Sequence, residues 1–393
     1  MIDNVGQAVI AGVTELLPVL RERAQEAEDA REVPAESVKS LEETGFFRLL
    51  QPARFGGHEA EPVTFLTAVR LIASACGSTG WVSSVLGVHA WQLALFPPQA
   101  QDEVWGEDSS TRMSSSYAPT GRAEAVDSGH RLTGRWSFSS GCAHARWVLL
   151  GAIVPGDDGT PADFRTFLLP ASDYVIDDVW DTVGLRGTGS NDIVVDGAFV
   201  PEHRSLSFSD VFRLDCPGQQ VNQAPLYQIP YGSLFSYAIT TPVIGMATGA
   251  YQAHVDYQRE RVRASYVGQK AAEDPHAQVR VAEAAAELDS AWLALERNMA
   301  ELMDHARSGT KIPLELRLRV RRDQVRGTGQ AISAVDSLFE NSGGRALRTG
   351  TPIQRFWRDA HSGRVHAIND PERALSTFGR GEFGLKIQPD GMV

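Results

Sequence analysis

The sequence is poor in the residues that mark several large classes of protein. Its 393 residues include three isolated cysteines (Cys76, Cys142 and Cys216), without the spacing of a zinc site or a disulfide framework. The formal net charge of −12 argues against nucleic-acid binding, because phosphate binding needs a basic surface. No apolar run approaches the roughly 18 residues of a membrane span, and no basic-then-apolar leader is present. We therefore expect a cytoplasmic protein that binds no metal, nucleic acid or membrane.

A nicotinamide-binding fingerprint is also missing. The glycine-rich stretch GLRGTGSND (residues 184–192) lacks the required glycine spacing, and no strand–helix–strand pattern surrounds it. The chain is nevertheless long enough for two or three domains, or for one large unit with a full core.

The hydrophobic pattern divides the chain into three parts. Residues 1–111 have helical spacing and include a long apolar stretch at residues 63–96, which predicts a buried helix. Residues 112–215 change to a period of two with frequent turn signals, which predicts a small antiparallel β domain. Residues 216–393 hold four long helical patterns after an irregular segment at residues 208–230, which we interpret as a linker or lid. The prediction is an α+β fold that ends in an antiparallel four-helix bundle.

One stretch has the chemistry of a binding site for a flat ring. In GRWSFSSGCAHARW (residues 134–147), Trp136 and Phe138 alternate with polar residues as in a half-buried strand. Ser139 and Ser140 then supply hydroxyls, and Gly141 lets a backbone approach closely. A second cluster, SSSYAP, precedes it at residues 114–119. The alternative interpretation is a β-turn with surface serines.

Five stretches, in the correct order, resemble the acyl-CoA dehydrogenases. They are GFFRLLQPARFGG (residues 45–57), VGLRGTGSNDIVVDGAFVPEHR (183–204), DYQRER (256–261), FENSGGRA (339–346) and WRDA (357–360). The resemblance implies the acyl-CoA dehydrogenase fold: an N-terminal helical domain, a middle β domain and a C-terminal helical bundle.

The glutamate base of acyl-CoA dehydrogenases is missing from both of its family positions. One position, counted from Arg358, falls on Ala367, and the other lies in the helix leading to Arg261, where no glutamate occurs between Glu202 and Glu260. Dehydrogenation of a thioester is therefore not expected, unless the base is displaced.

The same fold serves the oxygenase components of two-component flavin-dependent monooxygenases. SSSYAP, FSSGCAHARW, GSTGWVSSVLGVHAW (residues 77–91) and RDAHSGRVHAINDPERA (358–374) resemble that branch, and most of all its members that hydroxylate a phenolic secosteroid in cholesterol degradation. The resemblance implies hydroxylation ortho to the phenol with O₂ and reduced FMN, or FAD. It also implies a separate NADH-dependent flavin reductase and a homotetramer. The alternatives are an oxygenase for a smaller phenol, such as p-hydroxyphenylacetate, or a flavin-binding protein without catalysis.

The resemblance also assigns residues to the flavin. Those around the ring are Trp81, Ser115, Ser116, Tyr117, Phe138, Ser139, Ser140, His366 and Ala367. Arg261 would pair with the phosphate, and Gly344 and Arg345 would contact the flavin from a neighbouring subunit. Without the resemblance, Trp81 would be interpreted as core and Arg261 as part of a helix salt bridge.

Three residues are assigned to catalysis. His366 would donate a hydrogen bond near the reactive atoms of the flavin, with Ser140 beside its N5 atom, and His361 competes for this role from another helical face. His89, together with Ser115, would contact the phenol.

Two further positions follow from the same comparison. Ile368 stands where the p-hydroxyphenylacetate relative has a tyrosine, which fits a larger and more apolar substrate. Asp370 precedes a proline and is expected to cap the next helix, although it could instead orient a histidine.

Overall fold

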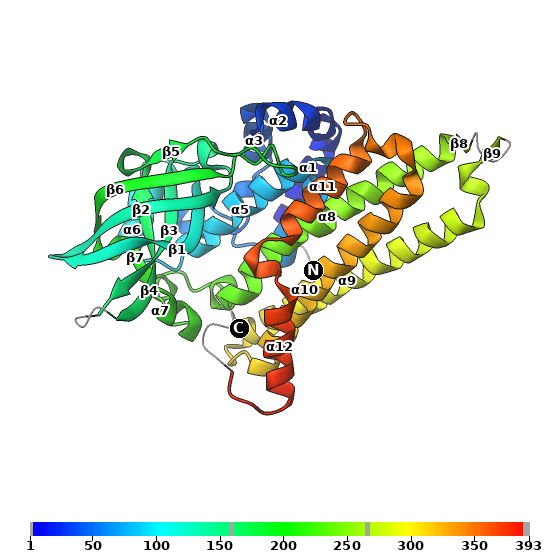
Figure 1. The fold of residues 1–393 in the computed structure, drawn as a ribbon. Helices are drawn as coiled ribbons and strands as arrows, with labels where there is room; N and C mark the ends of the chain where they lie inside the picture. The colour runs from blue at the N-terminus through cyan, green and yellow to red at the C-terminus, as the bar shows by residue number, and fades with distance from the viewer. Residues whose placement is uncertain (1–2, 157–159, 264–267, 388–393) are drawn as a thin grey trace.

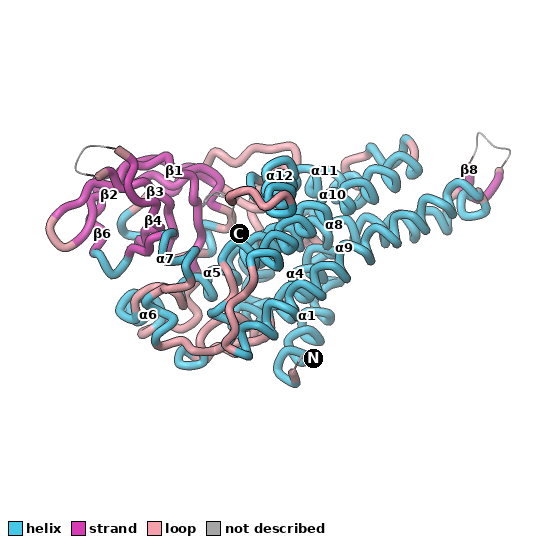
Figure 2. Tube along the Cα trace, turned by 90° about the horizontal axis from the view of Figure 1, so that it is seen from below, coloured by secondary structure: helices cyan, strands magenta, loops and turns pink. Residues whose placement is uncertain are grey.

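The chain folds as a sheet at one end and long helices that extend away from it (Figures 1 and 2). The structure, a computed structural model, describes residues 3–156, 160–263 and 268–387. Within these residues, no helix is long and apolar enough to cross a membrane.

Six helices form the N-terminal part: α1 (Asn4–Glu22), α2 (Ala24–Ala30), α3 (Ala35–Glu43), α4 (Pro62–Ala75), α5 (Gly77–Leu93) and α6 (Pro98–Trp105). The apolar stretch 63–96 is two helices, because Cys76 between α4 and α5 has extended backbone angles. Every residue of α5 is buried, since α4, a C-terminal helix and the sheet surround it. The expectation that this stretch is buried is confirmed.

Seven strands form the sheet, in the order β5-β6-β2-β1-β3-β4-β7. They are β1 (Met113–Val126), β2 (Gly129–Ser139), β3 (Trp147–Pro155), β4 (Pro161–Pro170), β5 (Val175–Asp177), β6 (Asn191–Pro201) and β7 (Ser205–Ser207). A short hairpin of β8 (Val262–Arg263) and β9 (Gln269–Lys270) lies at the far end of the molecule (Figures 1 and 2).

The prediction of a wholly antiparallel sheet is wrong for one pair, because β1 and β3 run parallel. The β1–β2 hairpin brings the chain back to the side where β1 begins. A turn at Gly141 and a short 3₁₀ helix then deliver β3 to the free edge of β1, at its start, where the Arg146 N–H donates to Arg112 O. From that point β3 can run only beside β1 in the same direction.

The C-terminal helices are α7 (Phe208–Arg213), α8 (Tyr231–Glu260), α9 (Pro275–Ser308), α10 (Leu314–Ser342), α11 (Pro352–Arg364) and α12 (Pro371–Glu382). Helices α8 to α11 form the predicted bundle, and α12 packs on α10 (Figure 1). Asp370 caps α12 by accepting from the Glu372 N–H at 2.9 Å, which confirms that prediction.

The segment 208–230 is not a loose linker. It contains α7 and two short 3₁₀ helices, and it buries Phe208 and Tyr227 in the main core. The glutamines and prolines of this segment are typical of a loop, so its composition did not predict that it packs against the core.

Candidate active site

His89 lies fully buried in the middle of α5 and offers one ring nitrogen to the interior. Its Nδ1 is 3.4 Å from the Tyr117 hydroxyl, which also makes a short hydrogen bond to Gln92 Oε1. The single proton of Tyr117 goes to Gln92, since an amide oxygen can only accept. His89 Nδ1 must therefore carry a proton, and Nε2 holds a lone pair. No residue of the described part of the chain hydrogen-bonds to that Nε2.

Burial determines the charge of both His89 and Tyr117. It lowers the pKa of His89 to about 3 and raises the pKa of Tyr117 well above its ordinary value. At neutral pH both side chains are uncharged, so His89 Nε2 is a neutral hydrogen-bond acceptor in an apolar setting.

Aromatic rings surround this acceptor. His89 stacks on Phe235 of α8 at 6.2 Å between ring centroids, and Phe235 packs edge-to-face with Tyr117 at 5.4 Å. Tyr231 and Phe208 close the cluster. A polar acceptor with apolar, flat neighbours suits an aromatic substrate with one hydroxyl.

A second cluster joins α5, β2 and the segment after α11. Trp81 Nε1 donates to Ser140 Oγ at 3.1 Å, and the Trp81 ring lies 5.9 Å from that of His366. His366 Nδ1 accepts from the Ile368 N–H at 3.2 Å, so the proton of this imidazole sits on Nε2. Burial lowers the pKa of His366 to about 4, which leaves a neutral N–H donor.

Gly363 on α11 allows this close approach. A Cβ atom there would lie 2.9 Å from Val243 Cγ2 on α8 and 3.0 Å from Trp81 Cζ3. The absence of a side chain thus brings α11 against Trp81 and places His366 beside it.

His361 lies elsewhere. Its Nε2 is 2.8 Å from Asp336 of α10, and its ring packs on Trp357 at 4.6 Å. Of the two competing histidines, His366 is the one that contacts the cluster around Trp81.

The serines of β1 and β2 divide between the two faces of the sheet. Ser115 and Tyr117 share one face of β1, whereas the Ser116 hydroxyl donates to Ser137 O at 2.7 Å. Ser139 lies inside and donates to Ser114 at 3.1 Å.

Phe138 near the end of β2 is a large apolar residue that is exposed. Its φ of 70° lies in the left-handed region, and its side chain is 69% exposed next to Trp180. An aromatic residue in this conformation is strained, and strain of this kind is common at binding sites.

Arg261, assigned to the phosphate, and Gly344 and Arg345, assigned to the flavin of a neighbouring subunit, lie far from these clusters. Arg261 follows α8 and donates to Asn341 O at 2.9 Å, next to the segment that holds Gly344 and Arg345. From Val243, near Trp81, α8 runs on to Glu260 over about 25 Å at about 1.5 Å per residue. The structure thus brings Arg261, Gly344 and Arg345 together, but not next to the ring cluster of the same chain. Ala367 is exposed beside His366.

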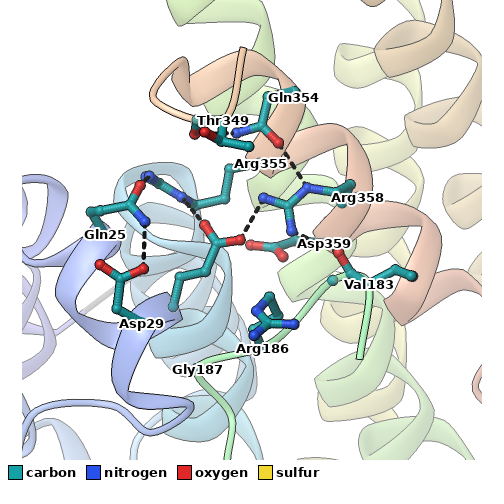
Figure 3. Close-up of polar contacts among 12 residues, drawn as sticks. Gln25, Asp29, Val183, Arg186, Gly187, Thr349, Gln354, Arg355, Arg358 and Asp359 are labelled. Carbon is teal, nitrogen blue, oxygen red and sulfur yellow. Dashed lines mark hydrogen bonds and ion pairs between the residues drawn. The ribbon is translucent and has the colours of Figure 1, made fainter. Parts of the chain in front are cut away.

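A network of charged side chains fixes the loop between β5 and β6 against α11 (Figure 3). Arg355 and Arg358 both pair with Glu28 of α2, at 2.8 and 2.6 Å. Arg358 also donates to Val183 O at 2.6 Å, and Asp359 accepts from the Leu185 N–H at 2.6 Å.

That loop carries a chain of hydroxyl groups into the site. Thr188 Oγ1 lies 2.7 Å from Ser190 Oγ, which lies 2.7 Å from Ser140 Oγ, and all three residues are buried. The residues Thr188, Ser190, Gln92 and Phe235 were not predicted. Gln92 could have been found, because it lies one helical turn after His89 on the same face. For the other three the sequence holds no comparable signal.

Comparison with known proteins agrees with this architecture. The acyl-CoA dehydrogenase N-terminal domain matches residues 14–109, and the acyl-CoA dehydrogenase C-terminal domain matches residues 237–371. The chain thus has the acyl-CoA dehydrogenase fold: a helical N-terminal part, a mixed sheet and a helical C-terminal part.

Relatives that match nearly the whole chain define the family more narrowly. A flavin-dependent monooxygenase, oxygenase subunit HsaA, from Rhodococcus jostii (strain RHA1) is 59% identical over 96% of this chain and 98% of its own. The subunit of that name from Mycobacterium tuberculosis is 54% identical over 96% of both chains. The crystal structure of 3-HSA hydroxylase from Rhodococcus sp. RHA1 superposes with a TM-score of 0.95 at 57% identity, over 98% of this chain and 99% of that one.

The chain therefore belongs to the family of HsaA oxygenase subunits of flavin-dependent monooxygenases. It is the oxygenase component of a two-component flavin-dependent enzyme, as the resemblance implied.

The side chains around Trp81 fit a flavin ring. Phe138 offers an exposed aromatic face, His366 a neutral N–H donor and Ser140 a hydroxyl in a buried setting. These are the groups that a flat ring with polar edges needs.

Proposed function

We propose that the protein hydroxylates a phenolic secosteroid ortho to its hydroxyl, using O₂ and reduced FMN. One oxygen atom enters the aromatic C–H bond and the other leaves as water, with two electrons from the flavin. The bound flavin supplies the oxygen transfer, and the protein positions the phenol and excludes water.

The observation that carries this proposal is that His89 Nε2 is buried and has no hydrogen-bond partner in the described part of the chain. A phenol hydroxyl donates to this atom, and the hydrogen bond raises electron density on the ring carbon ortho to the oxygen. A phenol has an ordinary pKa of about 10, so such assistance matters. His366 and Ser140 act on the flavin side, with Ser140 facing N5.

A steroid is favoured over a small phenol by the apolar character of the side chains around His89 and His366. Phe208, Tyr231 and Phe235 are aromatic, and Ile368 is an apolar side chain packed against the main core. The 57%-identical relative is a hydroxylase of 3-HSA, which supports the same class of substrate.

We further propose a homotetramer in which each flavin is shared by two chains. Arg261, which follows the end of α8, and Gly344 and Arg345, which follow α10, lie near the end of α8 that is about 25 Å from Val243. They are too far away to reach the phosphate of a flavin bound beside Trp81 in the same chain. A neighbouring copy supplies them. Large apolar side chains exposed near α11, such as Val365 and Val183, would be covered in this assembly.

The reduced flavin comes from a separate NADH-dependent reductase, and the reaction takes place in the cytoplasm, where NADH is available. The names of the relatives support a separate partner, because each is an oxygenase subunit.

The test uses the oxygenase loaded anaerobically with reduced FMN and then mixed with O₂ and a phenol. The secosteroid is expected to give a catechol, and p-hydroxyphenylacetate little product. His89→Ala should slow hydroxylation about 100-fold or more while flavin oxidation continues and H₂O₂ accumulates. His203→Ala, at an exposed ion pair with Glu103, is the control. Equal catechol yields from wild type and His89→Ala would contradict the assigned role, and preference for the small phenol would contradict the proposed substrate.

A further inference from the structure

The turn that carries His366 is held by one buried side chain, that of Asn369. Ala367–Asn369 form a short 3₁₀ helix after α11, and the Asn369 N–H donates to His366 O at 2.8 Å. The Asn369 Nδ2 group donates to Gly363 O at 2.8 Å, across the turn. Gly363 is the residue that lets α11 approach Trp81. Asn369, which is fully buried, therefore connects His366 to the point where α11 packs on Trp81.

Two side chains of α10 fix the orientation of the Asn369 amide group. Gln324 Nε2 donates to Asn369 Oδ1 at 2.7 Å, and Arg321 donates to Gln324 Oε1. A guanidinium group can only donate, and a carbonyl oxygen can only accept. Gln324 Oε1 must therefore face Arg321, and Gln324 Nε2 must face Asn369 Oδ1. Because the Nδ2 group of Asn369 meets Gly363 O at the other end, neither amide can turn over without placing two donors or two acceptors together.

Helix α8 completes this network. Thr240 Oγ1 donates to Asn369 Oδ1 at 3.0 Å and accepts from Gln324 Nε2. These three residues are fully buried, and so is nearly all of Arg321. Burial lowers the pKa of Arg321 to about 10, so its guanidinium group stays charged at neutral pH. It donates to uncharged oxygen atoms, Gln324 Oε1 and Ile368 O, and hydrogen bonds from a charged donor are strong.

We infer that Asn369 is a positioning residue that holds the His366 imidazole beside Trp81 with its Nε2 proton available to the flavin. The inference rests on the proposed function, in which His366 acts on the flavin side. His366 Nδ1 accepts from the Ile368 N–H at 3.2 Å, so the same turn sets both the place of the ring and its tautomer. Gln324 acts on His366 through Asn369.

The reaction depends on this placement because oxygen transfer to the phenol competes with the release of H₂O₂. An imidazole that is displaced by about 1 Å can lose a large part of its effect on a reaction. Movement of the turn would leave the oxidation of flavin by O₂ intact but lower the share that yields catechol. Coupling, defined as catechol formed per flavin oxidised, is therefore the quantity that reports on Asn369.

The experiment measures coupling for the oxygenase loaded anaerobically with reduced FMN and mixed with O₂ and the phenolic secosteroid. Asn369→Leu removes the amide with little change of volume, and coupling should fall about tenfold, with H₂O₂ formed in place of catechol. His366→Ala should lower coupling at least as much. The double variant should lower it no further than His366→Ala alone, because a residue that acts only through His366 then has nothing left to position.

Gln324→Glu separates positioning from stability. The new carboxylate keeps an oxygen atom for Arg321 and adds an ion pair with it, which preserves folding. The carboxylate also places an acceptor, instead of the Nε2 donor, against Asn369 Oδ1. The Asn369 amide then turns over and loses its hydrogen bond to Gly363 O. The midpoint of urea unfolding should stay close to that of wild type, while coupling falls about tenfold.

Asn298→Leu is the matched control. Asn298 is also fully buried in the bundle, and its Nδ2 group donates to the Tyr237 hydroxyl at 2.9 Å. Loss of this amide should lower the midpoint of urea unfolding, as Asn369→Leu does, because a buried hydrogen bond is lost in each variant. Coupling should remain that of wild type.

The outcomes separate the inference from the proposed function. If His366→Ala lowers coupling but Asn369→Leu and Gln324→Glu do not, the inference is overturned and the proposed function stands. The inference is also overturned if Asn298→Leu lowers coupling as much as Asn369→Leu, or if the double variant loses more than His366→Ala. Should Asn369→Leu fail to fold, Gln324→Glu decides. If wild type forms no catechol, the proposed function fails and the inference with it.

Discussion

Asp359 gives a quantitative test of the network that fixes the loop against α11. Its carboxylate is 3% exposed and accepts from the Leu185 N–H at 2.6 Å. Burial raises the pKa of Asp359 from 3.8 to about 6, although the hydrogen bond from Leu185 and the charge of Arg358 oppose the rise. We expect Asp359→Asn to remove this titration from the folding equilibrium.

The sign and size follow from the linkage between proton binding and folding. The folded state binds the proton of Asp359 more tightly than the unfolded state does. The resulting stabilisation is complete below the unfolded pKa of about 4 and is lost as pH rises through about 6. Two pKa units correspond to about 3 kcal/mol. The stability of Asp359→Asn relative to wild type should therefore rise by about 3 kcal/mol between about pH 4 and pH 7.

The assay is urea unfolding across that pH range at fixed protein concentration, for wild type and Asp359→Asn. Asp196→Asn, at an exposed carboxylate on β6, is the control and should run parallel to wild type. The difference between pH values matters, because the new amide also changes the absolute stability. Parallel curves for Asp359→Asn and wild type would refute the reasoning.

Three further perturbations test other parts of the site. Gln92→Met removes the acceptor of the Tyr117 proton, so the Tyr117 hydroxyl donates to His89 Nδ1 instead and the His89 proton moves to Nε2. The catechol yield per flavin oxidised should then fall about tenfold. Adding Tyr117→Phe to this variant should restore part of the yield. Glu28→Gln removes the shared partner of Arg355 and Arg358 and should cost about 2 to 3 kcal/mol in urea unfolding, whereas Glu26→Gln, exposed on the same helix, should cost under about 0.5 kcal/mol. Phe138→Gly relieves the positive φ and should stabilise the flavin-free protein by about 1 kcal/mol while weakening FMN binding; loss of stability instead would mean that the Phe138 ring contributes more to folding than its exposure indicates.

Local pattern was sufficient to predict most of the elements. The alternation around Trp136 predicted β2, and the four helical patterns expected in residues 216–393 correspond to α8 to α11. Resemblance to a family then predicted their arrangement. The parallel pairing of β1 and β3 was missed, because it depends on where the chain returns after Gly141 and not on any pattern within either strand.

The sequence predicted the location of the site better than it predicted the hydrogen bonds within the site. Spacing placed His361 and His366 on different faces of a helix, but only packing against Asp336 and Trp81 shows which histidine lies in the cluster. The position of the proton on His89 depends on Tyr117 and Gln92, because the Tyr117 hydroxyl contacts both side chains. A sequence shows which residues can donate or accept a hydrogen bond, but it does not show which donor lies close to which acceptor in the fold.

The most direct measurement of the central claim is oxygen-isotope labelling of the product. The oxygenase, loaded with reduced FMN under anaerobic conditions, is mixed with the phenolic secosteroid and isotopically heavy O₂, and the products are analysed by mass spectrometry. The account predicts a catechol that carries one heavy oxygen atom, formed in proportion to the flavin oxidised. Oxidation of the flavin with heavy H₂O₂ as the sole product, and unchanged secosteroid, would contradict it.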